Sequence, residues 1–147
     1  MVLDLTNPKG AMTGQRYIDS LKDGREVWLD GQRINDVTTH PAFTGIIHEL
    51  ARIYDLQSSD AHRDTMTFPS PETGNRVSYS WMVPKTLEDS QAKRRNSELW
   101  NKEAWGQLGR GPDVLAPFIL MLNESRDVFG EVKNEHCDFG QNIHNYY

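Results

Sequence analysis

The segment at residues 14–43 constrains the fold more strongly than any other part of this 147-residue chain. At its centre, the dipeptide Asp30-Gly31 accepts positive φ at both turn positions, as a two-residue hairpin turn requires. It lies between two short runs, 26–29 and 32–34, which we expect to be strands. Helix signals flank this hairpin on both sides. The sequence therefore predicts a mainly α-helical fold with small β-hairpins.

The two flanking helices have their own start signals. Thr13 can act as the N-cap of the first helix, and Gly24 is expected to end it, because glycine adopts the left-handed conformation at low cost. The second helix is expected to begin at His40-Pro41, since proline in the first turn loses no hydrogen bond. The apolar residues that follow have the spacing of one buried helix face: Phe43, Ile46, Ile47, Leu50, Ile53 and Tyr54.

The next part of the chain predicts a polar loop and a second hairpin. Residues 55–65 are polar and are expected to form the loop, and residues 66–68 and 76–81 are expected to pair as strands. A chain of this length supports one domain. The expected organisation is a flexible arm at residues 1–12 and one helical domain at residues 13–147.

A long helix is expected after the second hairpin. Thr86 and Asp89 have the spacing of a capping box, although aspartate is a weaker partner than glutamate at this position. The helix is predicted to run to Leu108, where Gly109 stops it.

Gly111-Pro112 predicts the start of a further helix, which Pro117 either kinks or delays. Residues 118–122 are apolar nearly all round this helix, as in a helix sandwiched between partners. A last set of apolar residues has helical intervals: Val132, Phe139, Ile143 and Tyr146. No stop signal follows them, so the chain is expected to be truncated.

Charge and composition exclude several classes of function. The formal net charge of −5 makes a nucleic-acid partner unexpected. No run approaches the roughly 20 apolar residues that cross a bilayer, so no membrane partner is expected. Cys137 is the only cysteine, which excludes an internal disulfide. The N-terminus lacks the apolar core of a signal peptide, and the cytoplasm is therefore the expected location.

No metal site and no catalytic residue are predicted from the residue pattern. His48-Glu49 begins a zincin-like sequence, but the second histidine that a zincin needs is Arg52 here, so a surface His-Glu pair is favoured. His136 and Cys137 are adjacent and point roughly 100° apart on a helix, and therefore do not converge on one ion with His144.

Arg110 is the strongest candidate for a binding residue, because it lies between two predicted helices. A guanidinium at this point offers a forked donor to a carboxylate, phenolate or phosphate. The alternatives are that Arg110 pairs with Asp113 or caps the preceding helix. A set of tryptophans either lines an aromatic pocket or belongs to the core: Trp81, Trp100 and Trp105.

Three ordered sequence blocks together resemble one known family. The first block, TG-x-x-Y-x-x-SL-x-DGR, is carried by residues 13–25, and the second, DV-x-x-HPAF, by residues 36–43, followed by Tyr54-Asp55. The third, beginning GR and containing PD, is carried by residues 109–114. This pattern is similar to the oxygenase component of the 4-hydroxyphenylacetate 3-monooxygenases, a family of FADH2-dependent phenol hydroxylases.

The resemblance implies an acyl-CoA-dehydrogenase-like architecture, of which this chain would be the helical N-terminal domain, without the β-barrel and the C-terminal helical bundle. It implies FAD as the cofactor, used as FADH2 supplied by a separate NADH-dependent flavin reductase. The reaction implied is hydroxylation of a phenolic small molecule with O2, and the assembly implied is a homotetramer. The fragment alone is expected to be inactive.

By the same resemblance, Arg110 matches the arginine that binds the substrate phenol. Val114 stands where the 4-hydroxyphenylacetate enzymes have a tyrosine, which makes the substrate site more apolar and favours another phenol. The family's catalytic base lies beyond Tyr147, and the cofactor-binding residues of this chain stay unassigned. Two alternatives remain: a stand-alone helical binding or oligomerisation module, and a 4-hydroxybutyryl-CoA dehydratase-like enzyme on the same scaffold.

Overall fold

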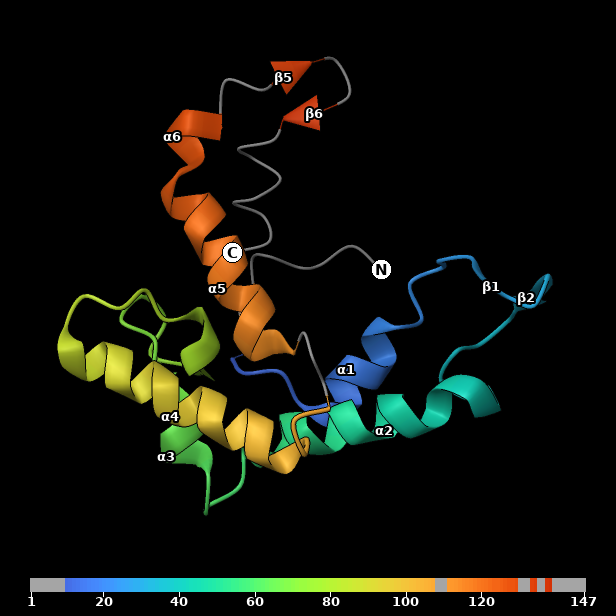
Figure 1. Ribbon diagram of the computed structural model, residues 1–147, viewed down its shortest axis with the longest axis horizontal. Helices are drawn as coiled ribbons and strands as arrows, with labels where there is room; N and C mark the ends of the chain where they lie inside the picture. Colours follow the sequence, from blue (N-terminus) through green and yellow to red (C-terminus); the bar gives the residue numbers. More distant parts are fainter. Residues whose placement is uncertain (1–9, 108–110, 130–132, 135–136, 139–147) are drawn as a thin grey trace. The chain divides into compact units, whose positions relative to one another are not determined.

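The computed structural model describes residues 10–107, 111–129, 133–134 and 137–138. Helices and short antiparallel hairpins form these parts (Figure 1), which confirms the predicted fold class of a mainly helical chain with small hairpins. The chain divides into two compact units, and the division falls within strand β4, between Val77 and Ser78. No helix in the described ranges has the length and apolarity needed to span a membrane.

Helix α1 (Gly14–Ser20) begins where the sequence predicts and ends earlier. The Thr13 hydroxyl accepts a hydrogen bond from the Arg16 backbone N–H at 3.3 Å, which confirms Thr13 as the N-cap. The prediction that Gly24 ends the helix is wrong, because Leu21 already closes it by donating to the carbonyl of Ile18. Gly24 has φ +82° and lies in the segment that leads into the first strand.

Helix α2 (Pro41–Leu56) packs along α1 at a very short distance (Figure 1). A Cβ atom added to Gly14 would lie 2.5 Å from the carbonyl oxygen of Ala51, so this contact admits only glycine. The Gly14 backbone N–H donates to the Asp55 carboxylate at 2.8 Å. One turn further along, the rings of Tyr17 and Tyr54 lie 5.2 Å apart. These contacts fix α1 on α2.

The hairpin of strands β1 (Val27–Leu29) and β2 (Gln32–Ile34) confirms the first hairpin prediction. Asp30 and Gly31 have φ of +50° and +75°, as the primed hairpin turn requires. Trp28 lies opposite Arg33 in the antiparallel register.

The N-terminus of α2 also follows the prediction. His40 is the N-cap, and its Nδ1 accepts from the Ala42 N–H at 3.2 Å, while Pro41 occupies the first turn. The predicted buried face is wrong at Ile46, which is 50% exposed. The buried stripe runs through Ile47 and Ala51, and Ile46 lies about 100° away from Ile47 around the helix.

The predicted loop at residues 55–65 is wrong in part, because α2 continues to Leu56 and a short helix, α3 (Arg63–Met66), follows. Strands β3 (Thr67–Pro69) and β4 (Arg76–Ser78) form the second predicted hairpin. Tyr79–Trp81 forms the 3-10 turn η1 and does not extend β4.

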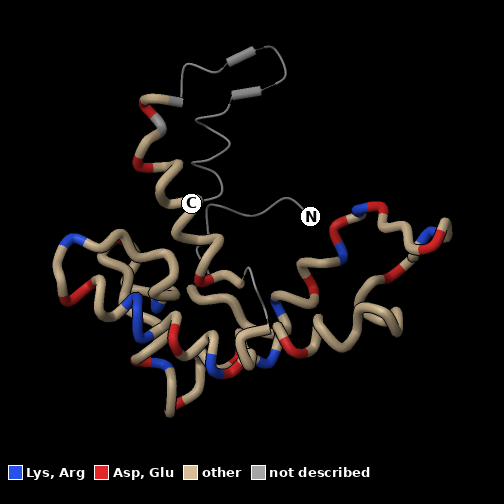
Figure 2. Tube along the Cα trace, in the orientation of Figure 1, with Lys and Arg blue, Asp and Glu red and all other residues tan. Residues whose placement is uncertain are grey.

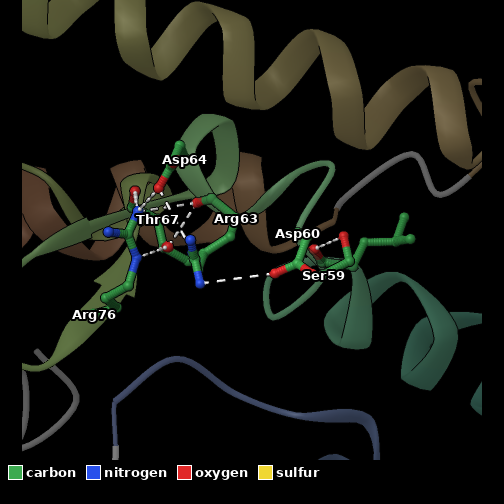
Figure 3. A network of polar contacts seen from close by, with 7 residues as sticks. Ser59, Asp60, Arg63, Asp64, Thr67 and Arg76 are labelled. Atoms are coloured by element: carbon green, nitrogen blue, oxygen red, sulfur yellow. Dashed lines mark hydrogen bonds and ion pairs between the residues drawn. The ribbon is translucent and has the colours of Figure 1, made fainter.

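Arg76 fastens α3 to this second hairpin (Figure 3). Its guanidinium donates to the Asp64 carboxylate at 2.7 Å, to the Thr67 hydroxyl at 2.9 Å and to the Arg63 carbonyl at 3.3 Å. Its carbonyl accepts from the Ala11 N–H at 2.7 Å. The end of the predicted arm is therefore attached to the first unit, whereas residues 1–9 lie outside the described residues.

Helix α4 (Leu87–Glu103) opens with the predicted capping box. The Thr86 hydroxyl accepts from the Asp89 N–H at 3.1 Å, and the Asp89 carboxylate accepts from the Thr86 N–H at 2.9 Å. The predicted end at Leu108 is wrong, because Trp105 and Gly106 adopt positive φ immediately after the helix. Gly109, the predicted stop, lies outside the described residues.

Buried polar contacts join α4 to η1 in the second unit. Asn96 is fully buried, and its amide donates to the Ser80 hydroxyl at 3.0 Å. The Lys93 ammonium donates to the carbonyls of Ser80 and Met82 at 3.1 and 2.6 Å, and burial lowers its pKa. Trp100, which is 1% exposed, supplies the largest apolar side chain of this core.

Helix α5 (Pro112–Glu124) starts at Pro112 and contains Pro117, so the alternative of a later start is wrong. It packs on η1 and α4, with Ala116, Leu120 and Asn123 buried. The short helix α6 (Arg126–Phe129) follows it.

The helical intervals of the last apolar residues predict a C-terminal helix, and this prediction is wrong at residues 133–134 and 137–138. Strands β5 (Lys133–Asn134) and β6 (Cys137–Asp138) pair in antiparallel register there, so alternating backbone geometry replaces the helical one. The apolar residues on which that prediction rested lie outside the described residues: Val132, Phe139, Ile143 and Tyr146.

We predict that Gly14→Ala lowers the free energy of unfolding of the first unit by about 1–3 kcal/mol, because the added methyl overpacks the α1–α2 contact. Gly45→Ala is the matched control, since a Cβ at Gly45 in α2 would meet nothing within 4 Å. It should raise stability by about 0.5–1 kcal/mol. Urea unfolding of both variants measures the difference, and equal effects would contradict the contact.

Candidate functional site

The predicted site lies at the start of α5. Gly111 is the N-cap of this helix, with φ −71° and ψ 174°, and it makes no side-chain capping bond. Its carbonyl accepts from the N–H groups of Val114 and Leu115 at 2.9 and 3.1 Å. Pro112 in the first turn fixes φ without losing a hydrogen bond. The sequence thus sets a rigid first turn that positions Asp113 and Val114.

Asp113 is the titratable side chain of this turn, and it is half-buried. Burial raises the pKa of the Asp113 carboxyl above its ordinary value, while hydrogen bonds from the backbone and from Asn101 oppose the rise. The Asn101 amide donates to the Asp113 carboxylate at 3.3 Å and so links the end of α4 to the start of α5. This carboxylate is held in place and partly desolvated.

Arg110, the predicted binding residue, lies outside the described residues. Its role and the two alternatives, pairing with Asp113 or capping the preceding helix, therefore stay predictions. The partner that the described structure gives the Asp113 side chain is Asn101.

Val114, the second predicted substrate residue, is 49% exposed. Leu115 beside it is exposed to the same degree, and Phe118 lies one turn further along. The first turn of α5 therefore offers an apolar surface that is open to contact with another molecule or chain segment.

The three tryptophans do not form one pocket. Trp100 is buried in the core, whereas Trp105 is 87% exposed and directly follows the end of α4. Trp81 is half-buried in the η1 turn. The core interpretation is confirmed for Trp100. The predicted aromatic pocket is wrong, because Trp105 has positive φ after the end of α4 and its side chain lies in solvent.

The remaining candidates are the residues that the sequence analysis weighed for a metal site. Arg52 forms an exposed ion pair with Glu49 at 2.8 Å, in agreement with a surface pair next to His48. Cys137 lies in β6, and His136 and His144 lie outside the described residues. In the parts of the chain that the structure describes, no three His, Cys, Asp or Glu side chains are grouped as a metal site would need.

Sequence reasoning missed two contacts that shape the molecule. The Asn101–Asp113 bond joins residues from two helices, and no spacing rule links them. The close approach of Gly14 to Ala51 was also missed, although a glycine one residue after a helix N-cap is itself a signal that something packs closely there.

Comparison with known proteins identifies the family of this chain. Residues 13–147 match the family model described as the 4-hydroxyphenylacetate 3-hydroxylase N terminal. The chain belongs to the 4-hydroxyphenylacetate 3-hydroxylase family and corresponds to its N-terminal part. This confirms the resemblance drawn from the three sequence blocks.

Individual relatives agree with this assignment. The 4-hydroxyphenylacetate 3-monooxygenase oxygenase component of Thermus thermophilus is 37% identical over 138 residues, which are 93% of this chain and 27% of that protein. The 4-nitrophenol 2-monooxygenase oxygenase component of a Rhodococcus species is 35% identical over 125 residues, which are 84% of this chain and 24% of that protein. The chain thus spans about a quarter of the length of these relatives.

Solved structures show the same relationship in three dimensions. The HpaB oxygenase component of 4-hydroxyphenylacetate 3-monooxygenase, complexed with FAD and 4-hydroxyphenylacetate, superposes with a TM-score of 0.80 at 36% identity. The match covers 93% of this chain and 27% of that one. The described fold is therefore that of the N-terminal part of such an oxygenase.

We predict that Asp113→Asn raises the thermal unfolding midpoint at pH 7. Because the folded pKa of Asp113 lies above its unfolded pKa, ionisation costs stability, and that cost grows as pH rises through the raised pKa. The gain should vanish below the ordinary Asp pKa of 3.8. Unfolding midpoints at pH 3 and pH 7 measure it.

Asp89→Asn is the control, and its expected effect on the unfolding midpoint is opposite to that of Asp113→Asn. Hydrogen bonds from Lys85 and Thr86 lower the pKa of Asp89, so this carboxylate stabilises the fold above its unfolded pKa and loses that effect as pH falls. Its replacement should lower the midpoint at pH 7 and lower it less at pH 3. A loss of stability in Asp113→Asn at both pH values would contradict the assignment.

Proposed function

We propose that this chain forms the N-terminal part of the oxygenase component of a two-component monooxygenase, which uses FADH2 and O2 to hydroxylate a phenolic substrate. The observation that carries the proposal is the alignment of 93% of the chain, at 36% identity, with an oxygenase solved with FAD and 4-hydroxyphenylacetate. Relatives named as 4-nitrophenol and 4-hydroxyphenylacetate monooxygenases support a phenol as the substrate class.

In this proposal Arg110 binds the phenol oxygen of the substrate. Deprotonation of the phenol raises the electron density of the ring, and a fixed guanidinium beside the oxygen favours the phenolate. Val114 comes four residues later in the sequence and has an exposed apolar side chain in the first turn of α5. Valine cannot donate a hydrogen bond, so the site should prefer a phenol with a less polar substituent than a carboxymethyl group.

The first turn of α5 does not fit the pyrophosphate of a flavin. A helix start suits an anion when its charges are favourable, but the first turn of α5 carries the Asp113 carboxylate, and the helix contains no Lys or Arg. We therefore expect the pyrophosphate of FAD to bind away from this turn, mostly at parts of the enzyme outside this chain. When bound, FAD would supply the activated oxygen, whereas Arg110 and Val114 would bind and orient the phenol.

The partners are part of the same proposal. A separate NADH-dependent reductase would supply FADH2, and the complete oxygenase would be a homotetramer with an acyl-CoA-dehydrogenase-like architecture in the cytoplasm. The mainly helical fold of the described residues agrees with the N-terminal domain of such an architecture.

The proposal is tested with a fusion of this chain to the part of the Thermus thermophilus relative that follows the matched region. Given chemically reduced FAD and air, the fusion should convert 4-nitrophenol or 4-hydroxyphenylacetate to the ring-hydroxylated product, as measured by chromatography. Arg110→Ala should lower kcat/KM by about 10- to 100-fold, because a hydrogen bond to a charged group is lost.

Val114→Tyr serves as the second variant of this series. It should shift the ratio of kcat/KM towards 4-hydroxyphenylacetate and away from 4-nitrophenol, because it adds a hydrogen-bond donor. A folded fusion that turns over neither phenol, while the parent enzyme does, would contradict the function. Unchanged kinetics of Arg110→Ala would contradict the role of Arg110.

A further inference from the structure

Helix α5 has an apolar face that no described element covers. Four large apolar side chains on it are between 47% and 55% exposed, and we call them the α5 outer face: Val114, Leu115, Phe118 and Met121. They recur at i, i+1, i+4 and i+7, which is the spacing of one helix face. The residues buried against η1 and α4 occupy the other side of the helix: Ala116, Leu120 and Asn123.

The charges of α5 restrict what this face can contact. Its ionisable residues are two acids, Asp113 at the start and Glu124 at the end. Figure 2 shows the backbone between them without charged residues. Helices that lie on membranes carry Lys and Arg on their polar face, and binding to nucleic acid also needs basic groups. These charges favour an apolar protein surface as the occupant.

The size of the face favours a covalently linked occupant over a second copy. Half of four large side chains amounts to on the order of 400 Å², which is within the range of the largest apolar patches on monomers. A standard dimer buries about 800 Å² on each partner. Contacts between domains of one chain are smaller, from about 600 Å² in total, and the covalent link supplies a high effective concentration.

We propose that the α5 outer face is the docking surface for the remaining part of the oxygenase polypeptide, through Leu115, Phe118 and Met121. This rests on the proposed function. In the solved relatives the matched region is 27% of the chain, so most of their polypeptide lies outside it and is available to cover the face. Val114 lies at the start of the same face, and docking would therefore place the proposed substrate residue at the edge of the interdomain contact.

Thiol labelling tests the docking without removing the helix. In a Cys137→Ser background, Phe118→Cys is introduced into the 147-residue chain and into the fusion with the Thermus thermophilus remainder. The maleimide reaction at position 118 should be at least about tenfold slower in the fusion, because the face is covered. Leu87→Cys is the matched control: Leu87 lies in the same unit, at the start of α4, and is 75% exposed, and its labelling should not change.

Thermal unfolding gives a second readout. The double variant Phe118→Gln, Met121→Gln should lower the midpoint of the fusion by about 5 °C or more and leave that of the 147-residue chain unchanged. Equal labelling rates at position 118 in both proteins, or equal slowing at position 87, would overturn the proposal. So would a dimer of the 147-residue chain, seen by sedimentation, that Phe118→Gln dissociates. A fusion that protects position 118 but hydroxylates no phenol would support docking and contradict only the proposed function.

Discussion

Helices α1 and α2 approach each other so closely at Gly14 that any side chain there would collide with the carbonyl of Ala51. The packing of α1 on α2 depends on this contact. It lets the Gly14 N–H reach the Asp55 carboxylate at 2.8 Å and brings the Tyr17 and Tyr54 rings together. Burial raises the pKa of Tyr54 to about 12, so this phenol stays protonated and belongs to the packing. The first sequence block of the family therefore builds a helix pair.

In the second unit, buried polar groups hold the elements together. Asn96 and Lys93 hold the η1 turn against α4, and α5 packs on both elements. This support positions the first turn of α5, where Asp113 is fixed by Asn101 and Val114 remains exposed. In our proposal this turn forms one wall of the substrate site, and the apolar face of the same helix is the surface on which the rest of the enzyme completes it.

Local signals in the sequence predicted the longer helices and the first two hairpins, whereas they did not predict α3, η1 or the β5–β6 pair. The Asp30-Gly31 turn and the Thr86–Asp89 capping box were predictable because each needs only neighbouring residues. Helix ends were not, since Leu21 and Trp105 close α1 and α4 before the glycines that seemed to stop them. In the candidate site, the helix start at Pro112 was predictable, whereas the Asn101–Asp113 bond depends on tertiary packing.

The central claim, that Gly14 is locked into the α1–α2 contact, is tested most directly by hydrogen exchange at its backbone amide. An amide in the first turn of a helix ordinarily exchanges quickly, because it has no partner within the helix. The Gly14 amide should instead exchange at least about a hundredfold more slowly than an exposed amide, together with the amides of α2, and Asp55→Ala should abolish the protection. Exchange of the Gly14 amide at the rate of an open loop in the unsubstituted chain would contradict the account.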